Sequence, residues 1–384
     1  MKILFVHDHK FYKEKGDFYS SGGFPKNIWS RYLENFSSMI VIGRKLDKKN
    51  LGLVQSSTEK VEFNLIEEYK NPIDEFLYPK KIDNNIIDSL KQVDAAIVRL
   101  PSVLGFRTIN ICKKINKPYA IEVVGCVWDS YWYYGNLKGK LLALIHYSRM
   151  KDIVRDSKFT IYVTKSYLQN RYKSNGFNAY ASNVKINDNP DTVLHNHKKI
   201  ISDNRKYIFG MLGKVDIYYK GYDIAIKALA YIKNDIPDFM LYIAGNGDGN
   251  NIRRLLDKYD LNESVKILKP IKSGEQVYEF LDNLNMYLHP ALTEGLPRAL
   301  IEAMSRGCPV LASSVGGIPE LLNGKYLHQP GDYKQLSKQI ENYSSDKEKL
   351  LLMANKNFFK AKEYTNSKLN KRRSEFFKNF RDSI

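Results

Sequence analysis

The chain has few of the features on which secreted and membrane proteins depend. Its three cysteines, Cys112, Cys126 and Cys308, are odd in number and far apart in a chain of 384 residues. That spacing gives neither a disulfide framework nor a cysteine-based metal site, so we expect three buried thiols. No apolar run reaches the roughly eighteen residues of a membrane-spanning helix, and the apolar start at residues 2–7 is too short for a signal peptide. We therefore expect a cytoplasmic protein.

Acidic residues are also scarce relative to basic ones. Against 60 Lys and Arg there are 42 Asp and Glu, a formal net charge of +18 at pH 7. This excess indicates an anionic partner, which is nucleic acid, an acidic membrane face or a phosphorylated substrate. Residues 101–180 alone hold 13 basic and 4 acidic side chains. Residues 137–151 within them predict a helix with one apolar and one basic face, typical either of core packing or of contact with an anionic bilayer.

Short apolar segments alternate with helical patterns in both halves of the chain, which is long enough for two domains. The alternation predicts an α/β protein with two doubly wound, Rossmann-like parallel sheets, and such sheets bind ligands at the carboxyl ends of their strands. The region 50–82 is less regular and carries no prediction. The expected strands are 2–7, 39–42, 95–100, 119–124 and 159–163 in the first series, and 207–212, 240–244, 265–268, 285–289 and 310–312 in the second.

The polar stretch 183–205 is rich in Asn, Asp, Lys and His and predicts a linker. It separates a first domain at 1–190 from a second at 205–365. The pair His195 and His197 within it has no cysteine or acidic cluster nearby, so a solvated linker is favoured over a metal site.

One block of the second half combines a strand, a loop and a helix. Pro297 precedes a helix-forming run that Gly307 ends. A proline fits a helix start because its missing N–H would have no partner there, so the loop presents free backbone amides to an anionic or hydroxyl-rich ligand. Glu294 and Glu302 can flank that point and accept hydrogen bonds from sugar hydroxyls. A capped surface helix with two solvated acids is the alternative.

Two further loops contain residues that can bind phosphate. Lys214 and Lys220, six residues apart after the strand 207–212, can both reach one diphosphate if the loop folds over it. Taken singly, each lysine is more often solvated. Gly22 and Gly23 stand before the first helical pattern, where glycine allows a backbone to approach a phosphate, although most such pairs only shape turns. The turn at 245–249 is likewise expected to be a tight turn without ligand contact.

The whole block closely resembles a known family signature. Glu294 and Glu302 with seven residues between them are followed by Ala303-Met304, Gly307, Pro309-Val310 and Gly316-Gly317-Ile318-Pro319-Glu320. This resembles the E-x7-E signature of retaining GT-B glycosyltransferases of family GT4. The resemblance implies two Rossmann-like domains facing a central cleft, with the acceptor in the first domain, the nucleotide sugar in the second, and a last helix within 366–384 that returns to the first. A basic tail that binds nucleic acid is the competing interpretation of that helix.

The resemblance also assigns roles to residues. Lys220 and Lys214 would bind the donor diphosphate, although the family has arginine where Lys214 stands. Glu294 would hold the sugar and, with the two lysines, make up the catalytic set, while Glu302 would hold the ribose. The remaining expected donor contacts are the amides of Gly295 and Leu296, together with Pro297, Gly22, Gly23, Gly213 and Ile271.

One departure concerns the first domain. Many family members have a histidine after the strand that here continues through residues 120–129, and this chain has none there. Glu122 or Asp129 could take over its contacts or be structural. The stretch 122–129 is similar to a subgroup associated with capsular and other surface polysaccharides.

The sequence therefore predicts sugar transfer, without a cofactor or metal, from a nucleotide sugar, most often a UDP-sugar in the family. The expected acceptor is a glycan or a polyprenyl-diphosphate-linked sugar at the inner face of the membrane. We expect peripheral contact with anionic lipid and no nucleic-acid partner. Two alternatives stay open: a nucleic-acid-binding protein, which the charge favours but for which an RNP, KH, zinc or helix-turn-helix signature is missing, and an epimerase or phosphorylase of the same fold.

Overall fold

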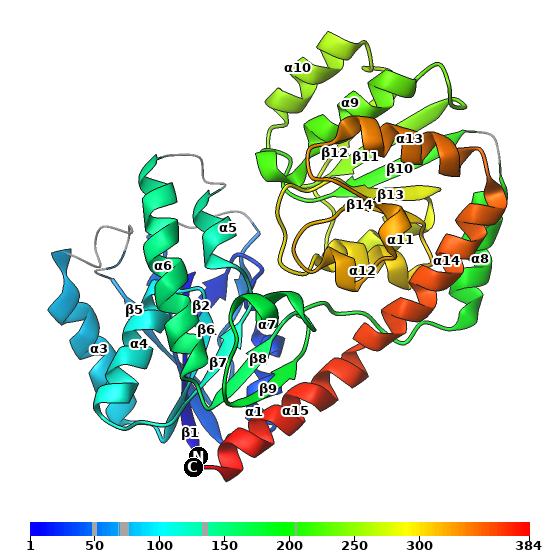
Figure 1. Cartoon of the computed structure of the whole chain (residues 1–384). Coiled ribbons are helices and arrows are strands. Elements are labelled where there is room, and N and C mark those ends of the chain that lie inside the picture. The colour runs from blue at the N-terminus through cyan, green and yellow to red at the C-terminus, as the bar shows by residue number, and fades with distance from the viewer. Residues whose placement is uncertain (48–51, 68, 70–76, 133–136, 204–205) are drawn as a thin grey trace. The chain divides into compact units, whose positions relative to one another are not determined.

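Figure 1 shows the computed structural model of the chain, which describes residues 1–47, 52–67, 69, 77–132, 137–203 and 206–384. The chain divides into two units, the first made of Met1–Ala181 and Asn370–Ile384 and the second of Ser182–Leu369. Each unit is a largely parallel sheet with helices on both faces, as the alternation of strands and helices predicts. Among the described residues, no helix is long and apolar enough to cross a membrane.

The sheet of the first unit is built around its first strand. β1 (Lys2–Glu14) pairs in parallel with β3 (Ser38–Lys45) on one side and β6 (Ala95–Leu100) on the other. The sheet continues through β7 (Tyr119–Val123), β8 (Phe159–Tyr162) and β9 (Phe177–Tyr180) beyond β6, and through β5 (Val61–Ile66) beyond β3. Its helices are α1 (Ser30–Leu33), α3 (Pro79–Lys91), α4 (Val103–Lys114), α5 (Val127–Trp132), α6 (Leu137–Arg155), α7 (Tyr167–Arg171) and most of α15 (Asn366–Asp382).

Alternation along β1 directs its side chains to two cores. Leu4 and Val6 face the cluster formed with α3, α4 and α6. Phe5 faces the other side of the sheet, where its ring centroid lies 5.2 Å from that of Tyr32. The phenylalanines of α15 pack on this second side, with Phe377 5.3 Å from Tyr32 between ring centroids. The aromatic residues of the last helix are therefore buried in a protein core.

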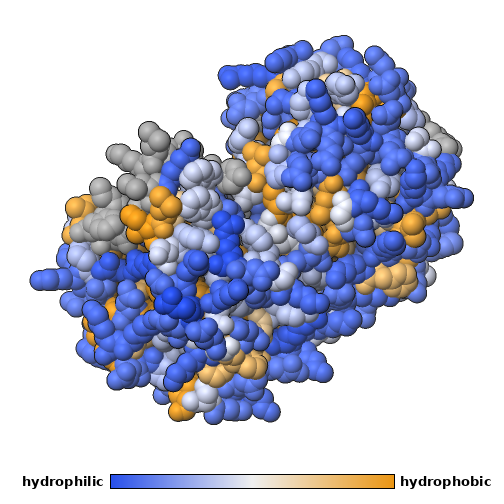
Figure 2. Space-filling model, in the orientation of Figure 1, coloured by the Kyte–Doolittle hydropathy of each residue, from blue (hydrophilic) through white to orange (hydrophobic). Residues whose placement is uncertain are grey.

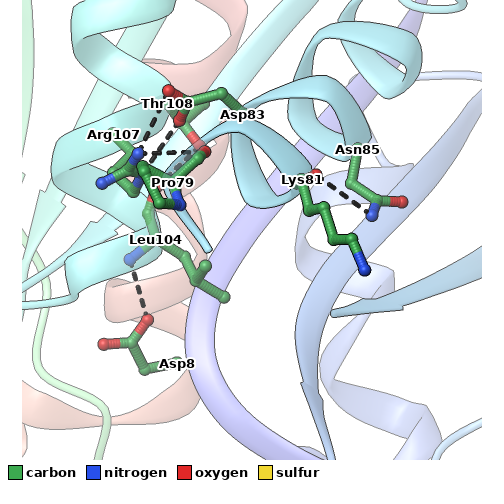
Figure 3. Close-up of polar contacts among 8 residues, drawn as sticks. All are labelled: Asp8, Pro79, Lys81, Asp83, Asn85, Leu104, Arg107 and Thr108. Carbon is green, nitrogen blue, oxygen red and sulfur yellow. Dashed lines mark hydrogen bonds and ion pairs between the residues drawn. The ribbon is translucent and has the colours of Figure 1, made fainter. Parts of the chain in front are cut away.

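Polar contacts connect α4 to β1 and to α3 (Figure 3). Asp8 accepts hydrogen bonds from the backbone N–H groups of Val103 and Leu104, at 2.7 and 3.0 Å, so a carboxylate from the middle of β1 caps α4. Arg107 binds both carboxylate oxygens of Asp83 on α3, at 2.8 and 3.1 Å. The two helices are thus held in one orientation against the sheet.

The prediction that the first strand ends at His7 is wrong. The strand continues to Glu14 and turns back through β2 (Asp17–Ser20), which pairs with β4 (Val54–Gln55). The parallel register shifts between Val6 and Lys10, so the intervening polar residues form an irregularity inside the strand. The strand resumes because Phe11 is only 1% exposed and packs against other aromatic rings.

The second unit is a six-stranded, all-parallel sheet in the order β12-β11-β10-β13-β14-β15. Its first strand, β10, has β11 on one side and β13 on the other, so the strand order reverses at that point. Ligands of such sheets bind at this switch point. The strands are β10 (Tyr207–Leu212), β11 (Phe239–Ala244), β12 (Val265–Leu268), β13 (Met286–His289), β14 (Val310–Ser313) and β15 (Leu327–His328).

Helices cover both faces of this sheet. One face carries α9 (Tyr222–Ile232), α10 (Asn250–Tyr259) and α13 (Tyr333–Ser344), as Figure 1 shows. The other carries α8 (Asp191–Ser202), α11 (Glu275–Asp282), α12 (Arg298–Ser305) and α14 (Lys347–Ala361). The short α12 follows β13 directly, which places the start of that helix beside the switch point.

The predicted linker at 183–205 is also wrong over most of its length. Residues 191–202 form α8, which packs against α14. Leu194, His197 and Ile201 recur at helical spacing and are at most 4% exposed, while the charged residues of the segment lie on the outer face. Average polarity concealed this amphipathic pattern. His197 is consequently buried and not solvated.

The buried His197 predicts a loss of stability in acid. Burial lowers the pKa of His197 to about 4, whereas an unfolded histidine has a pKa of about 6.5. As pH falls from 6.5 to 4, His197 therefore binds a proton in the unfolded state but stays neutral in the folded state. This uptake costs roughly 3 kcal/mol of unfolding free energy by pH 4.

We expect His197→Leu to reduce the slope of unfolding free energy against pH across this window, measured by urea unfolding at a series of pH values. Part of the slope should remain, because burial also lowers the pKa of His9 and of His328 to about 4. His195→Gln, which alters an exposed residue of the same helix, should keep the wild-type slope. Equal slopes for all three proteins would contradict the assignment.

Candidate active site

A cavity of about 470 Å³ lies in the second unit. Residues that follow β10, β11, β12 and β13 line it, so it opens at the carboxyl ends of the strands where the strand order reverses. It brings together eight residues that the sequence predicts for the site, namely Gly213, Lys214, Lys220, Ile271, Glu294, Leu296, Pro297 and Glu302. Its volume falls within the range of small-molecule sites.

Close backbone contact shapes the floor of this cavity. Gly245 lies so close to Gly213 that a Cβ atom at position 245 would sit 1.6 Å from the carbonyl oxygen of Gly213. Asp216 accepts hydrogen bonds from the backbone N–H groups of Asp248 and Gly249, at 3.2 and 3.0 Å. The loops after β10 and β11 are therefore held together, and Gly245, in the expected tight turn, lines the cavity.

The turn after Lys220 also requires glycine. Gly221 has a φ of 73°, and a Cβ atom there would lie 1.9 Å from the carbonyl oxygen of Pro290. Only glycine tolerates both the left-handed backbone and this close approach. The contact brings the loop after β10 against the loop after β13, and in this way Lys220 reaches Glu294.

Lys220 and Glu294 form the central ion pair of the cavity. The Lys220 ammonium contacts the Oε1 atom of Glu294, and the Nε2 atom of His289 lies 3.2 Å from the same oxygen. Burial acts to raise the pKa of Glu294, but the hydrogen bond from His289 and the charge of Lys220 outweigh it and hold this pKa at about 2. Glu294 is therefore an anion at neutral pH, and both of these contacts fall on one of its two oxygens.

Glu302 has a different environment. It lies in α12, and burial raises its pKa while the charge of Arg298 opposes the rise. The two carboxylates of the signature are therefore not equivalent. Lys220 and His289 both contact Glu294 and stabilise its charge, whereas only the more distant charge of Arg298 stabilises Glu302, which also lines the cavity.

His289 is a site residue that the sequence reading treated only as the end of a strand. The hydroxyl of Tyr287 lies 3.5 Å from its Nδ1 atom. Since an ionised carboxylate only accepts hydrogen bonds, Nε2 of His289 carries the proton and Nδ1 accepts from Tyr287. Tyr287 and His289 alternate along β13 and so face the same side of the sheet. A histidine directly before Pro290, inside the signature block, was the available signal.

Asn246 and Arg298 also line the cavity and were not predicted. Asn246 belongs to the turn that was expected to lack ligand contact. Arg298 is the first residue of α12 and is exposed. Among the described residues, no group of three or more His, Cys, Asp or Glu side chains is placed to hold a metal ion.

Three predicted residues lie outside the cavity lining. The carbonyl oxygen of Gly295 accepts a hydrogen bond from the N–H of Gly317 at 2.7 Å, so this glycine secures the loop. Gly22 and Gly23 belong to the first unit and follow β2. Ser20 shapes their turn by accepting a hydrogen bond from the N–H of Phe24 at 3.0 Å. Binding of the donor by these two glycines stays a prediction.

The two acids considered as replacements for the missing histidine are engaged within the first unit. Glu122 is 5% exposed and binds the Nε atom of Arg99 at 2.8 Å and the hydroxyl of Tyr32 at 3.0 Å. Asp129 accepts a hydrogen bond from the hydroxyl of Tyr167 at 3.0 Å. Glu122 therefore has a structural role.

Comparison of the sequence with known proteins identifies its relatives. Residues 194–358 match the family model described as "Glycosyl transferases group 1". The chain is 37% identical over 341 residues to Protein CapJ of Staphylococcus aureus, covering 88% of this chain and 85% of that protein. It is 25% identical to the capsular polysaccharide biosynthesis glycosyltransferase CapM of the same organism over 39% of each chain.

The fold is shared with solved glycosyltransferases. The Anabaena protein HepE, solved in complex with UDP-glucose, superposes with a TM-score of 0.65 over 98% of both chains at 14% sequence identity. Such low identity shows a common GT-B fold and no more. The similarity to CapJ and the family model establish that the chain belongs to the group 1 family of glycosyltransferases.

Proposed function

We propose that this glycosyltransferase moves a sugar from a nucleotide-sugar donor, a UDP-sugar, to a glycan or lipid-linked acceptor during assembly of a capsule or another surface polysaccharide. The observation that carries the proposal is the cavity at the switch point, where the Lys220–Glu294 ion pair and Glu302 line one space. The relationship to CapM supports the surface polysaccharide, and the UDP-glucose complex of HepE supports the donor.

We assign a task in this reaction to five residues of the cavity. Lys220 and Lys214 bind the diphosphate, whose negative charge grows as the sugar leaves, and fixed cations stabilise that charge without reorganising. Glu294, ionised and held by two partners, accepts hydrogen bonds from sugar hydroxyls through its remaining lone pairs. Glu302 accepts hydrogen bonds from the ribose, and Ile271 lies beside the base.

We infer retention of the anomeric configuration from the family signature. The bond between the anomeric carbon and the diphosphate oxygen breaks, and the acceptor hydroxyl forms its new bond on the same face. The acceptor proton passes to an oxygen of the departing diphosphate. No protein nucleophile is required, so the enzyme acts by positioning the reactants and stabilising charge.

We assign the acceptor to the first unit and propose that this unit contacts an anionic membrane. Its helix α6 exposes Leu144 and Ile145 by 54% and 56%, and Figure 2 shows an apolar patch at the surface over this helix. Lys140 and Lys151 are exposed on the same helix, and the Nζ atom of Lys140 lies 4.9 Å from the ring of Trp132. Apolar and basic side chains together fit the surface of a bilayer that contains acidic lipid.

The donor site predicts the effect of removing Lys220. We expect Lys220→Met to lower kcat/KM by roughly a hundredfold or more, because a fixed charge that stabilises the leaving group is lost. Transfer from a radiolabelled nucleotide sugar would measure it. Lys227→Met is the matched control, since Lys227 also pairs with a carboxylate, 2.9 Å away on α9, and does not line the cavity. Equal activity of both variants and the wild type would contradict the proposal.

The contact of His289 with Glu294 predicts a selective loss of sugar binding. His289→Leu removes a hydrogen bond to a charged group, which is worth about 1.5 kcal/mol or more, roughly a tenfold change in affinity. Because Glu294 holds the sugar and not the nucleotide, affinity for the UDP-sugar should fall while affinity for UDP changes little. Calorimetry with both ligands would separate the two effects, and equal losses would indicate a general disturbance of the cavity.

The exposed face of α6 predicts binding to anionic vesicles. The wild type should float with vesicles of phosphatidylglycerol at low salt and remain behind with phosphatidylcholine. The double variant Leu144→Glu, Ile145→Glu should lose flotation, because two charges replace the apolar contact. Leu352→Glu with Phe359→Glu, an exposed apolar pair on α14, is the control. A loss confined to the α14 variant would locate the contact on the other unit.

A further inference from the structure

We propose that Arg298 binds the diphosphate of the donor together with Lys214, as a further cation of the cavity. This inference rests on the proposed nucleotide-sugar function and assigns a role to a residue that the family signature leaves without one. It also supplies a guanidinium in place of the arginine that the family has where Lys214 stands in this chain.

The charges that line the cavity are unevenly matched. The cations are Lys214, Lys220 and Arg298, and the anions are Glu294 and Glu302. Lys220 is engaged by Glu294. Lys214 and Arg298 are both exposed, and among the described residues neither has a carboxylate within ion-pairing distance. Both cations therefore line the cavity without such a partner among the described residues, although the charge of Arg298 acts on Glu302. This arrangement matches a ligand that carries several negative charges.

The position of Arg298 in its helix is unfavourable without an anion. Arg298 is the first residue of α12, and no acidic residue lies in the first turn of that helix. The start of a helix carries a partial positive charge, so a cation placed there is repelled and an anion is attracted. An arginine that both lies at a helix start and lines a cavity is explained by an anion bound between its guanidinium and the free N–H groups of the first turn.

Arginine can bind a phosphate in a way that Lys214 cannot. Lysine presents a compact charge and no fork, whereas a guanidinium donates two parallel hydrogen bonds to phosphate oxygens. Lys214 precedes α9 and Arg298 begins α12, so the two side chains approach the cavity from different loops. A diphosphate between them would contact the Lys214 ammonium on one side and accept two hydrogen bonds from the Arg298 guanidinium on the other.

A different role for Arg298 has to be distinguished. Its charge lowers the pKa of Glu302 against the effect of burial, four residues further along the helix. If Arg298 only maintained Glu302 in its ionised state, its loss would weaken the hold on the ribose. The affinity for a nucleoside without phosphate would then fall as much as the affinity for the nucleoside diphosphate. A direct contact with phosphate predicts an effect on the diphosphate alone.

The test compares the full-length wild type with Arg298→Gln, Arg298→Lys and Arg254→Gln by calorimetry, using UDP directly and uridine by competition. Arg254 is exposed on α10 and does not line the cavity, so it is the matched control. We expect Arg298→Gln to weaken UDP binding tenfold to a hundredfold, roughly the contribution of a charge-assisted pair, and to leave uridine unchanged. Arg298→Lys should fall between, and Arg254→Gln should match the wild type.

A second-site variant strengthens the test. Adding Lys214→Arg to Arg298→Gln restores a guanidinium to the cavity and should recover part of the lost UDP affinity. Thermal unfolding confirms that each variant is folded. UDP binding by Arg298→Gln at wild-type strength, or an equal loss for uridine and UDP, overturns the inference. If Lys220→Met still weakens UDP binding in that case, the proposed function stands. If the wild type binds none of UDP, GDP and ADP, both the proposed function and the inference about Arg298 are wrong.

Discussion

The ion pair between Lys220 and Glu294 is the contact around which the second unit is organised. Placing two charges in a partly buried cavity is costly unless further hydrogen bonds support them. Here His289 supplies one to Glu294, and Tyr287 orients His289 from the same strand. The backbone also brings the two residues of the ion pair together. A glycine at position 221 is needed for the loop after β10 to contact the loop after β13. The result is a carboxylate that stays ionised and rigid before any ligand arrives.

The surplus of positive charge lies in two different places. In the second unit it appears as cations that line one cavity and suit a diphosphate. In the first unit the excess lies in residues 101–180, where basic and apolar side chains share the outer face of α6. Net charge alone did not distinguish nucleic acid from phosphorylated sugars or lipid, since all three are anionic. Membership of the glycosyltransferase family favours the last two.

Local pattern allowed most of the fold and half of the site to be predicted. Nearly every strand of the second unit begins and ends within a residue or two of its expected position, because buried parallel strands are short apolar runs bounded by turns. Glu294 and Glu302 were found through the spacing of the signature, and Lys214 and Lys220 through the loop that follows the strand 207–212. The helix α8 was missed because composition, averaged over a polar stretch, conceals three buried positions at helical spacing. The continuation of β1 was missed because its core contacts come from distant aromatic residues.

The sequence by itself determined the fold class, the family signature and the identity of the charged residues, since these depend on patterns along the chain. Tertiary structure decided which residues act as partners. The spacing of the signature did not identify His289 and Arg298 as site residues, yet the switch point of the sheet brings both to the same cavity as Lys214, 84 residues before Arg298. It also showed Glu122 to be held by Arg99 from the neighbouring strand. Pairing between strands is a long-range contact, and neither local propensity nor spacing can determine it.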